Sequence, residues 1–286
     1  MAASGAASGT APGTASGTAS GAASGAAPGS ASGDASGSAS ESASGTASGR
    51  MPMIDPSSIP VRFSNLKQFS RSPAHYLHAI TSEREETPAM ILGSAVHALV
   101  LQPEHLEVHG DDRRSKEYRD AKKRLADDIP VFTEREIRMA MPIASSVLGN
   151  RLAMEALSGV RERRILWEIG PRQCSSTPDA YNEERNQIGD LKVCFTSEPS
   201  EFIKHAESMF YHAQLSFYRR ATNMRDAICR IVVVEKTAPY LVSLINLGSA
   251  KLEQGDMLCR GWFERLITCE ASGKFPGYCE DIYEWE

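Results

Sequence analysis

Long apolar runs are missing from this sequence, so we expect no segment of it to cross a membrane. A strong excess of positive charge is missing too, because 31 Lys and Arg stand against 36 Asp and Glu, a net charge of −5. This charge balance excludes a protein that binds nucleic acid with its whole surface. It leaves room for a local basic groove beside an acidic site.

Cysteine pairs of the Cys-x-x-Cys type are also absent, which argues against a zinc site. The six cysteines are Cys174, Cys194, Cys229, Cys259, Cys269 and Cys279. The even spacing of the last three is too wide for an iron–sulfur cluster. The first residues lack the basic start and apolar core of a secretory signal. We therefore expect reduced thiols and a cytoplasmic location.

Residues 2–49 lack large apolar side chains and consist almost wholly of Ala, Ser, Gly and Thr. Such a segment has nothing to offset the entropy lost on ordering, so we expect a disordered tail or tether over residues 1–50. Residues 50–286 carry all 31 basic and 34 of the 36 acidic side chains, and the domain is expected over residues 51–286. This length is ample for one hydrophobic core, and we expect a single domain there.

The periodicity of apolar residues predicts an alternation of helices and strands in that domain. Helices are expected at 65–69, 73–79, 90–101, 134–159, 198–223 and 249–272, and strands at 162–169, 173–181, 187–195, 227–236 and 240–247. The run 227–236 is apolar almost throughout, which favours burial on both faces. The order predicts an α/β fold with a central mixed sheet flanked by helices.

Two carboxylates and one ammonium are predicted to meet at the edge of this sheet. Asp179 follows Pro178 in one run, and Asp190 and Lys192 lie in the next, after a polar turn at 182–186. Alternation along a strand puts Asp190 and Lys192 on one face. Two carboxylates without cysteine ligands favour Mg²⁺ or Mn²⁺, and phosphodiester hydrolysis is a natural use of such a site. A surface ion pair is the alternative interpretation of Asp190 and Lys192 alone.

Two helices add further candidates. Gly93 and His97 lie four residues apart on one helix face, and we expect Gly93 to allow close packing and His97 to project into its neighbour. Gln214 and Tyr218 have the same spacing on a later helix. Taken alone, His97 is also compatible with an ordinary core histidine, and Gln214 and Tyr218 with a polar helix face.

Together, the motifs Gly93-x-x-x-His97, Pro178-Asp179, Asp190-x-Lys192 and Gln214-x-x-x-Tyr218 resemble the PD-(D/E)xK nuclease superfamily in its RecB-like branch. Residues 90–103, 234–240 and 275–278 look like the RecE-type (exonuclease VIII) nuclease domain. The likeness covers about residues 60–282 and implies a restriction-endonuclease-like core over the domain at 51–286. Many relatives have a hydroxyl residue and a basic residue where this chain has Val193 and Thr177.

The resemblance implies a role for each motif residue. The expected metal ligands are Asp179, Asp190, the Leu191 carbonyl and His97. The catalytic set comprises Asp179 and Asp190 with Lys192, Gln214 and Tyr218. Lys192 would orient or activate the attacking water, and Gln214 and Tyr218 would position Lys192 and the DNA backbone. Glu168, one strand earlier, is a further candidate as an auxiliary acid.

The function implied is that of a Mg²⁺- or Mn²⁺-dependent exonuclease that resects one strand of double-stranded DNA for phage-type homologous recombination. Such relatives form homo-oligomeric rings and work beside a RecT-like single-strand annealing protein, in the cytoplasm of a bacterial or phage-infected cell. The alternatives are a RecB-like nuclease of other polarity, an endonuclease, or a non-catalytic DNA-binding module of the same fold. Because every expected ligand position is filled, we favour a catalytic protein.

Overall fold

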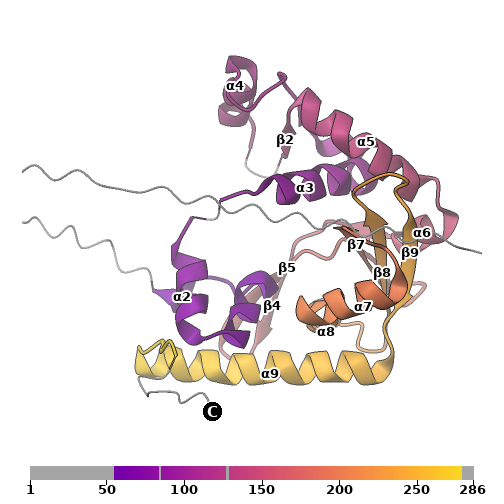
Figure 1. Ribbon diagram of the computed structural model, residues 1–286. Helices are drawn as coiled ribbons and strands as arrows, with labels where there is room; N and C mark the ends of the chain where they lie inside the picture. Colours follow the sequence, from indigo (N-terminus) through magenta and orange to yellow (C-terminus); the bar gives the residue numbers. More distant parts are fainter. Residues whose placement is uncertain (1–54, 84, 127–128, 279–286) are drawn as a thin grey trace, which may run out of the picture. The chain divides into compact units, whose positions relative to one another are not determined.

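The computed structural model describes residues 55–83, 85–126 and 129–278 (Figure 1), so the expected tail and Cys279 lie outside the described residues. The first half contains η1 (Pro56–Ser58), α1 (Phe63–Leu66), η2 (Lys67–Ser70), α2 (Pro73–Thr81), α3 (Pro88–Leu101), η3 (Pro103–His105), β1 (Glu107–Val108), α4 (Lys116–Arg124), β2 (Val131–Phe132), α5 (Glu134–Leu148) and α6 (Arg151–Ala156). The second half contains β3 (Val160–Arg161), β4 (Ile165–Ile169), β5 (Arg172–Ser176), β6 (Ala180–Asn182), β7 (Gln187–Cys194), α7 (Pro199–Ser208), α8 (Tyr211–Ala221), β8 (Ile228–Glu235), β9 (Val242–Asn246) and α9 (Ser249–Ser272).

A five-stranded mixed sheet forms the centre, with strand order β3-β6-β7-β8-β9. Strands β7 and β8 run parallel, and the other neighbours pair antiparallel. Helices α3, α5 and α6 cover one face and α8 and α9 the other, as Figure 1 shows. The predicted fold class, a mixed sheet flanked by helices, is confirmed.

Strand β8 shows why the sheet lies at the centre of the core. Ile231 and Val233 pack with the cluster under α8 and α9, whereas Val232 and Val234 pack with the cluster under α3 and α5. Alternate side chains of a strand point to opposite faces, so a continuous apolar run is buried on both sides. The burial predicted for this strand is confirmed.

Two predicted strands are wrong in their extent. Of the run 162–169 only β4 is a strand, because Glu162 has a φ of 47° that no extended strand can accommodate, and β3 ends before the run at Arg161. The run 173–181 is divided into β5, which pairs with β4 in a separate two-stranded sheet, and β6, which joins the central sheet. The break falls at Thr177–Asp179, where Pro178 has no N–H to donate to a ladder.

Two of the predicted helices are each broken into two shorter helices. The expected helix 198–223 is divided into α7 and α8 by Phe210, which has a left-handed backbone with φ 59°. The expected helix 134–159 ends at Leu148, and Asn150 caps a new helix, α6. The first helix begins at Phe63, two residues before its predicted start. The prediction of α9 is confirmed, and a capping box between Thr133 and Glu136 begins α5.

Gly189 fixes the strand that carries the candidate site. A Cβ at this position would lie 2.1 Å from the carbonyl oxygen of Ala156, at the end of α6. Only glycine permits such an approach of the strand to α6. Among the helices that the structure describes, none has the length and apolar character needed to span a bilayer.

Candidate metal centre

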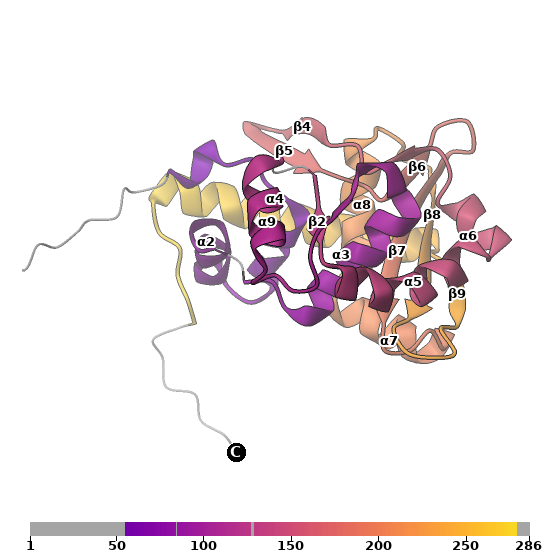
Figure 2. The ribbon, with the colours of Figure 1, turned by 90° about the horizontal axis from the view of Figure 1, so that it is seen from above.

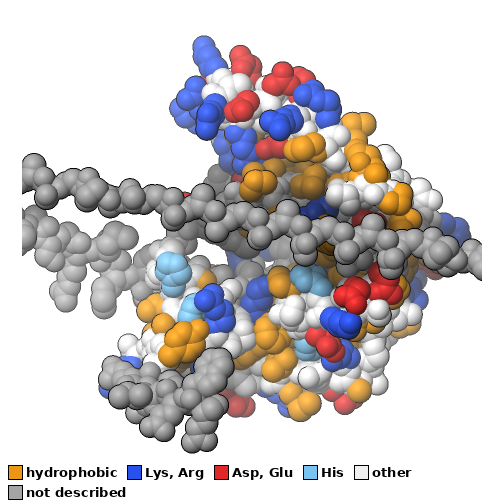
Figure 3. All heavy atoms as spheres, viewed as in Figure 1, with side chains coloured by type: hydrophobic (Ala, Val, Ile, Leu, Met, Phe, Trp, Pro, Cys, Tyr) orange, Lys and Arg blue, Asp and Glu red, His pale blue; other side chains and the backbone are white. Residues whose placement is uncertain are grey.

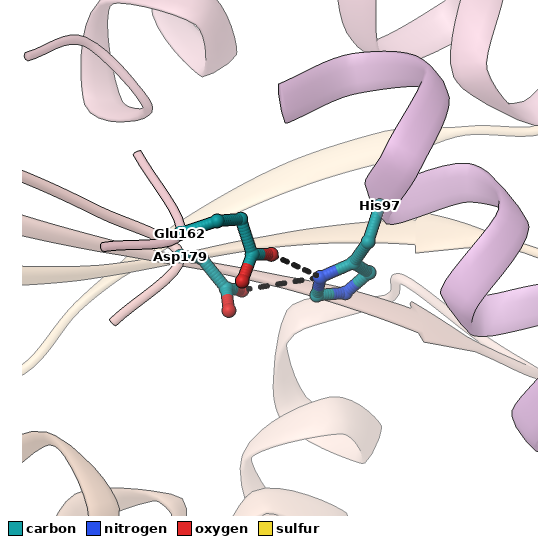
Figure 4. Close-up of side chains that lie close together, drawn as sticks. All are labelled: His97, Glu162 and Asp179. Atoms are coloured by element: carbon teal, nitrogen blue, oxygen red, sulfur yellow. Dashed lines mark ion pairs between the residues drawn. The ribbon is translucent and has the colours of Figure 1, made fainter. Parts of the chain in front are cut away.

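Three side chains from separate elements converge beside the central sheet (Figure 4). His97 comes from α3, Glu162 from the connection between β3 and β4, and Asp179 from the residue before β6. Their ligand atoms all lie within 4.8 Å of one another. His97 Nδ1 is 3.7 Å from Glu162 Oε1 and 3.6 Å from Asp179 Oδ2. We call these three residues the acidic triad.

The pairing of β3, β6 and β7 places the two acids of the triad. Arg161 pairs with Ala180, and one residue further the Glu162 N–H donates to the Asp179 carbonyl at 3.2 Å. The Leu191 N–H donates to Asp179 Oδ2 at 2.6 Å, which fixes the carboxylate. The sheet backbone therefore orients both acids.

His97 lies between two carboxylates, which shift its pKa. Its side chain is 24% exposed, and burial alone would lower its pKa. The negative charge of Asp179 opposes this effect, and Glu162 opposes it both by its charge and by a hydrogen bond. Together the two carboxylates outweigh burial and raise the pKa of His97 above its ordinary value. The triad thus attracts positive charge, as a metal site must.

A second pair lies beside the triad on β7. Lys192 Nζ is 2.5 Å from Asp190 Oδ2, and Asp190 is fully buried. No described residue donates a well-directed hydrogen bond to either oxygen of Asp190. The carboxylate therefore has Lys192 as a charge partner, but it lacks the hydrogen bonds that water would give it.

The pKa values of this pair follow from the same arrangement. Burial raises the pKa of Asp190, with a further contribution from Asp179, and Lys192 only partly opposes the shift. Burial would lower the pKa of Lys192, but Asp190 and Asp179 together raise it. Lys192 is therefore an ammonium ion at neutral pH, and Asp190 is a carboxylate that a nearby cation would stabilise.

Helix α8 supplies the other wall of the site. Lys192 Nζ lies 4.9 Å from the ring centroid of Tyr211, a cation–π contact. The Gln214 amide donates to the Tyr218 hydroxyl at 3.0 Å. Burial, and then the carboxylates of Asp179 and Asp190, raise the pKa of Tyr218. Lys192 thus contacts α8 through the Tyr211 ring, and Gln214 bonds to Tyr218.

The structure brings the predicted site residues to one place, with two differences from the expected arrangement. Asp190 pairs with Lys192 and is not a member of the triad, and Leu191 contributes its N–H to Asp179. Glu168 is exposed on β4 and does not belong to the triad, whereas Glu162 does. Metal ligation by Asp190 and by the Leu191 carbonyl remains a prediction.

Sequence reasoning missed Glu162 and Tyr211. Glu162 is the first residue of the predicted strand 162–169, although the charged run 161–164 contains no apolar residue and marks a connection. Tyr211 gave no local signal, because its role depends on the break at Phe210 that begins α8.

The donor set fits a divalent metal ion. Two carboxylates and one imidazole offer oxygen and nitrogen ligands without sulfur, a combination that Mg²⁺, Mn²⁺ and several other divalent ions accept. The buried, poorly solvated Asp190 adds a third carboxylate next to the triad. These residues describe a divalent-cation site without fixing which ion binds.

A mixed sheet that presents Asp179, Asp190 and Lys192 beside a helical histidine defines a domain of the PD-(D/E)xK type. The chain belongs to the family described as PDDEXK-like domain of unknown function (DUF3799), whose model matches residues 62–284. The superfamily predicted from the four motifs is confirmed, and the RecE-type assignment stays a prediction.

The fold is similar to that of a solved protein. The crystal structure of a protein from Eubacterium rectale, described as a "putative exonuclease", matches with a TM-score of 0.58 and 14% sequence identity. The match covers 77% of this chain and 85% of that chain, and it shows a shared fold. A comparison with curated protein sequences found no match.

Proposed function

We propose that the protein is a metal-dependent nuclease that hydrolyses phosphodiester bonds in DNA. The observation that carries the proposal is the acidic triad of His97, Glu162 and Asp179 next to the buried pair of Asp190 and Lys192. Membership of a PDDEXK-like family and the shared fold with a protein described as an exonuclease support it.

Each residue has a distinct task in this proposal. His97, Glu162 and Asp179 would hold the divalent ion, which when bound supplies charge neutralisation and a more acidic water. Asp190 holds the Lys192 ammonium in place, and the Tyr211 ring limits its movement from the other side. Lys192 would orient the attacking water and offset the charge that develops on the phosphoryl oxygens.

A catalytic role explains a costly arrangement better than a purely structural one. Burying a lysine and an aspartate together loses more solvation energy than their attraction usually returns. Two apolar side chains would fill the same space at a lower cost in free energy. We therefore favour a nuclease over a non-catalytic DNA-binding module.

Within this class, we propose an exonuclease that uses Mg²⁺ or Mn²⁺ to resect one strand of double-stranded DNA for phage-type recombination. The resemblance of residues 90–103, 234–240 and 275–278 to RecE-type nucleases supports this choice. The same resemblance supports a homo-oligomeric ring, a RecT-like annealing partner and a cytoplasmic location. A RecB-like nuclease of other polarity and an endonuclease are the alternatives.

Digestion of linear duplex DNA labelled separately at its 5′ and 3′ ends tests the proposal. We expect loss of one label in Mg²⁺ or Mn²⁺, no loss in EDTA, and no cleavage of circular duplex. Lys192→Ala should abolish the activity, and Glu168→Gln, an exposed acid outside the triad, should leave it unchanged. Cleavage of circles would favour the endonuclease. Binding without cleavage in either metal would favour the non-catalytic module.

A further inference from the structure

Helix α4 is the most basic element near the metal centre. It carries Lys116, Arg119, Lys122, Lys123 and Arg124 against Glu117 and Asp120, in a chain whose net charge is negative. All five basic side chains are exposed, and none pairs with a carboxylate of the described residues. Figure 3 shows Lys and Arg side chains gathered over this helix, at the top of the view.

Most of the basic residues of α4 lie on one side of the helix. Helix α4 lies beside β2 (Figure 2), and Tyr118, Ala121 and the neighbouring Leu125 pack with Val131 of that strand. Lys116, Arg119, Lys122 and Lys123 follow one another around an adjoining side at helical spacing, while Glu117 and Asp120 lie on the other. The helix therefore presents one continuous basic side.

Helix stabilisation alone does not account for this pattern. Cations in the last turn interact favourably with the helix dipole, which would explain Lys122, Lys123 and Arg124. Lys116 stands at the first helical position, where the dipole disfavours a cation. Arg119 lies three and four residues before Lys122 and Lys123, and like charges at these spacings repel. An external anion beside the basic side would relieve this repulsion.

A groove joins this side of α4 to the metal centre. It has a volume of about 470 Å³, and its lining includes Lys122 and Tyr118 of α4 together with His97 and Glu162 of the triad. Gly93, one turn before His97, borders the same groove, and a Cβ there would meet no atom within 4 Å. The close packing expected of Gly93 is therefore wrong, because this glycine faces open space.

The helix is held in place relative to that groove. Arg113, just before α4, donates to Glu86 and Glu136 at 2.7 Å each and lies 5.5 Å from the Tyr118 ring centroid. Glu136 belongs to α5, which packs on the central sheet. These contacts anchor the base of α4, so its basic side keeps a defined position beside the triad.

We propose that α4 is a DNA-backbone contact, whose basic side binds phosphates of the duplex that enters the groove leading to the metal centre. The inference rests on the proposed nuclease function. Lysine and arginine without neighbouring exposed aromatic side chains recognise phosphates and not bases, so the contact is independent of sequence and sensitive to salt.

The salt dependence of binding tests the proposal. Affinity for a short linear duplex is measured in EDTA over a range of NaCl concentrations, for the full chain and for the triple variant Lys116→Ala, Lys122→Ala, Lys123→Ala. Each lost phosphate contact lowers the slope of log affinity against log salt by about 0.9, so we expect a slope smaller by about 2 to 3. The matched control is Glu117→Ala with Asp120→Ala, on the other side of the same helix, which should leave the slope unchanged.

Hydrolysis of bis(p-nitrophenyl) phosphate in Mn²⁺ separates the two proposals. This diester is too small to reach α4, so the triple variant should hydrolyse it at the same rate as the unmodified protein while its KM for duplex DNA rises. If the triple variant still hydrolyses the small diester and its salt slope is unchanged, the proposed role of α4 is wrong and the nuclease proposal is unaffected. If the unmodified protein cleaves neither substrate, the nuclease proposal fails, and a reduced slope would still support α4 as a DNA contact.

Discussion

Glu162 and Asp179 are joined by a backbone hydrogen bond of 3.2 Å, so the sheet itself sets the spacing of the two acids beside His97. Because the scaffold fixes both acids, neutralising one should weaken metal binding without changing the fold. We expect Glu162→Gln to lower the affinity for Mn²⁺ by at least about tenfold, measured by titration calorimetry. Glu168→Gln is the control. Equal losses in the two variants would show that Glu162 is not a ligand.

The stability of the metal-free protein should depend on pH in a defined direction. The folded pKa values of Asp190 and His97 are both raised, so each group favours folding at low pH and loses this contribution as pH rises through its folded pKa. For Asp190 the loss begins near its ordinary value of 3.8 and is complete above the folded pKa of about 6. For His97 it begins near 6.5.

In EDTA, the melting temperature should therefore fall as pH rises from 5 to 8. Over this interval the contribution of Asp190 is on the order of 1 kcal/mol, because only about one pH unit separates pH 5 from its folded pKa of about 6, and this corresponds to a fall of about 2–4 °C. Asp190→Asn should flatten the slope below pH 6.5, and His97→Gln above it. A saturating divalent ion should reverse the trend, because it binds the deprotonated groups. A flat profile in EDTA would contradict the raised pKa values.

Two glycines should respond to alanine in opposite ways. At Gly93 an added methyl group meets open space, and alanine favours a helix by about 0.5–1 kcal/mol, so Gly93→Ala should raise the free energy of unfolding by that amount. At Gly189 the methyl group would collide with the Ala156 carbonyl, and Gly189→Ala should cost about 2 kcal/mol or more. Urea denaturation measures both changes.

A longer side chain at position 93 gives a second test of the groove. Gly93→Leu should leave stability near that of the Gly93→Ala variant but reduce duplex affinity, since the side chain would project into the groove. Unchanged DNA binding in this variant would mean that the groove does not accept DNA.

Tyr211 should act on catalysis through Lys192 and not through the metal. Loss of the cation–π contact in Tyr211→Leu would cost about 0.5–2 kcal/mol, which predicts a kcat about two- to thirtyfold lower with unchanged Mn²⁺ affinity. Tyr211→Phe keeps the ring and should restore the rate. If the phenylalanine variant is as slow as the leucine variant, the hydroxyl and not the ring is the group that matters.

The sequence predicted best what short-range patterns decide. The apolar run of β8, the Asp190–Lys192 alternation on β7 and the length of α9 all follow from periodicity, and the structure agrees with each. Glu162 could not be found in this way, because its place depends on the pairing of β3 with β6 and on a left-handed turn. Gly93 was misjudged for a similar reason, since only the tertiary structure shows what faces a glycine.

The small cluster under α4 has a consequence for amide hydrogen exchange. Strand β7 is hydrogen-bonded to β6 and β8 and buried between two large apolar clusters, whereas α4 rests on Tyr118, Ala121 and Val131 with Leu125 beside them. The amides of Asp190 and Lys192 should therefore exchange only when the whole domain unfolds, and those of α4 through local opening. The strand that carries Asp190 and Lys192 would stay closed while the backbone hydrogen bonds of α4 open locally.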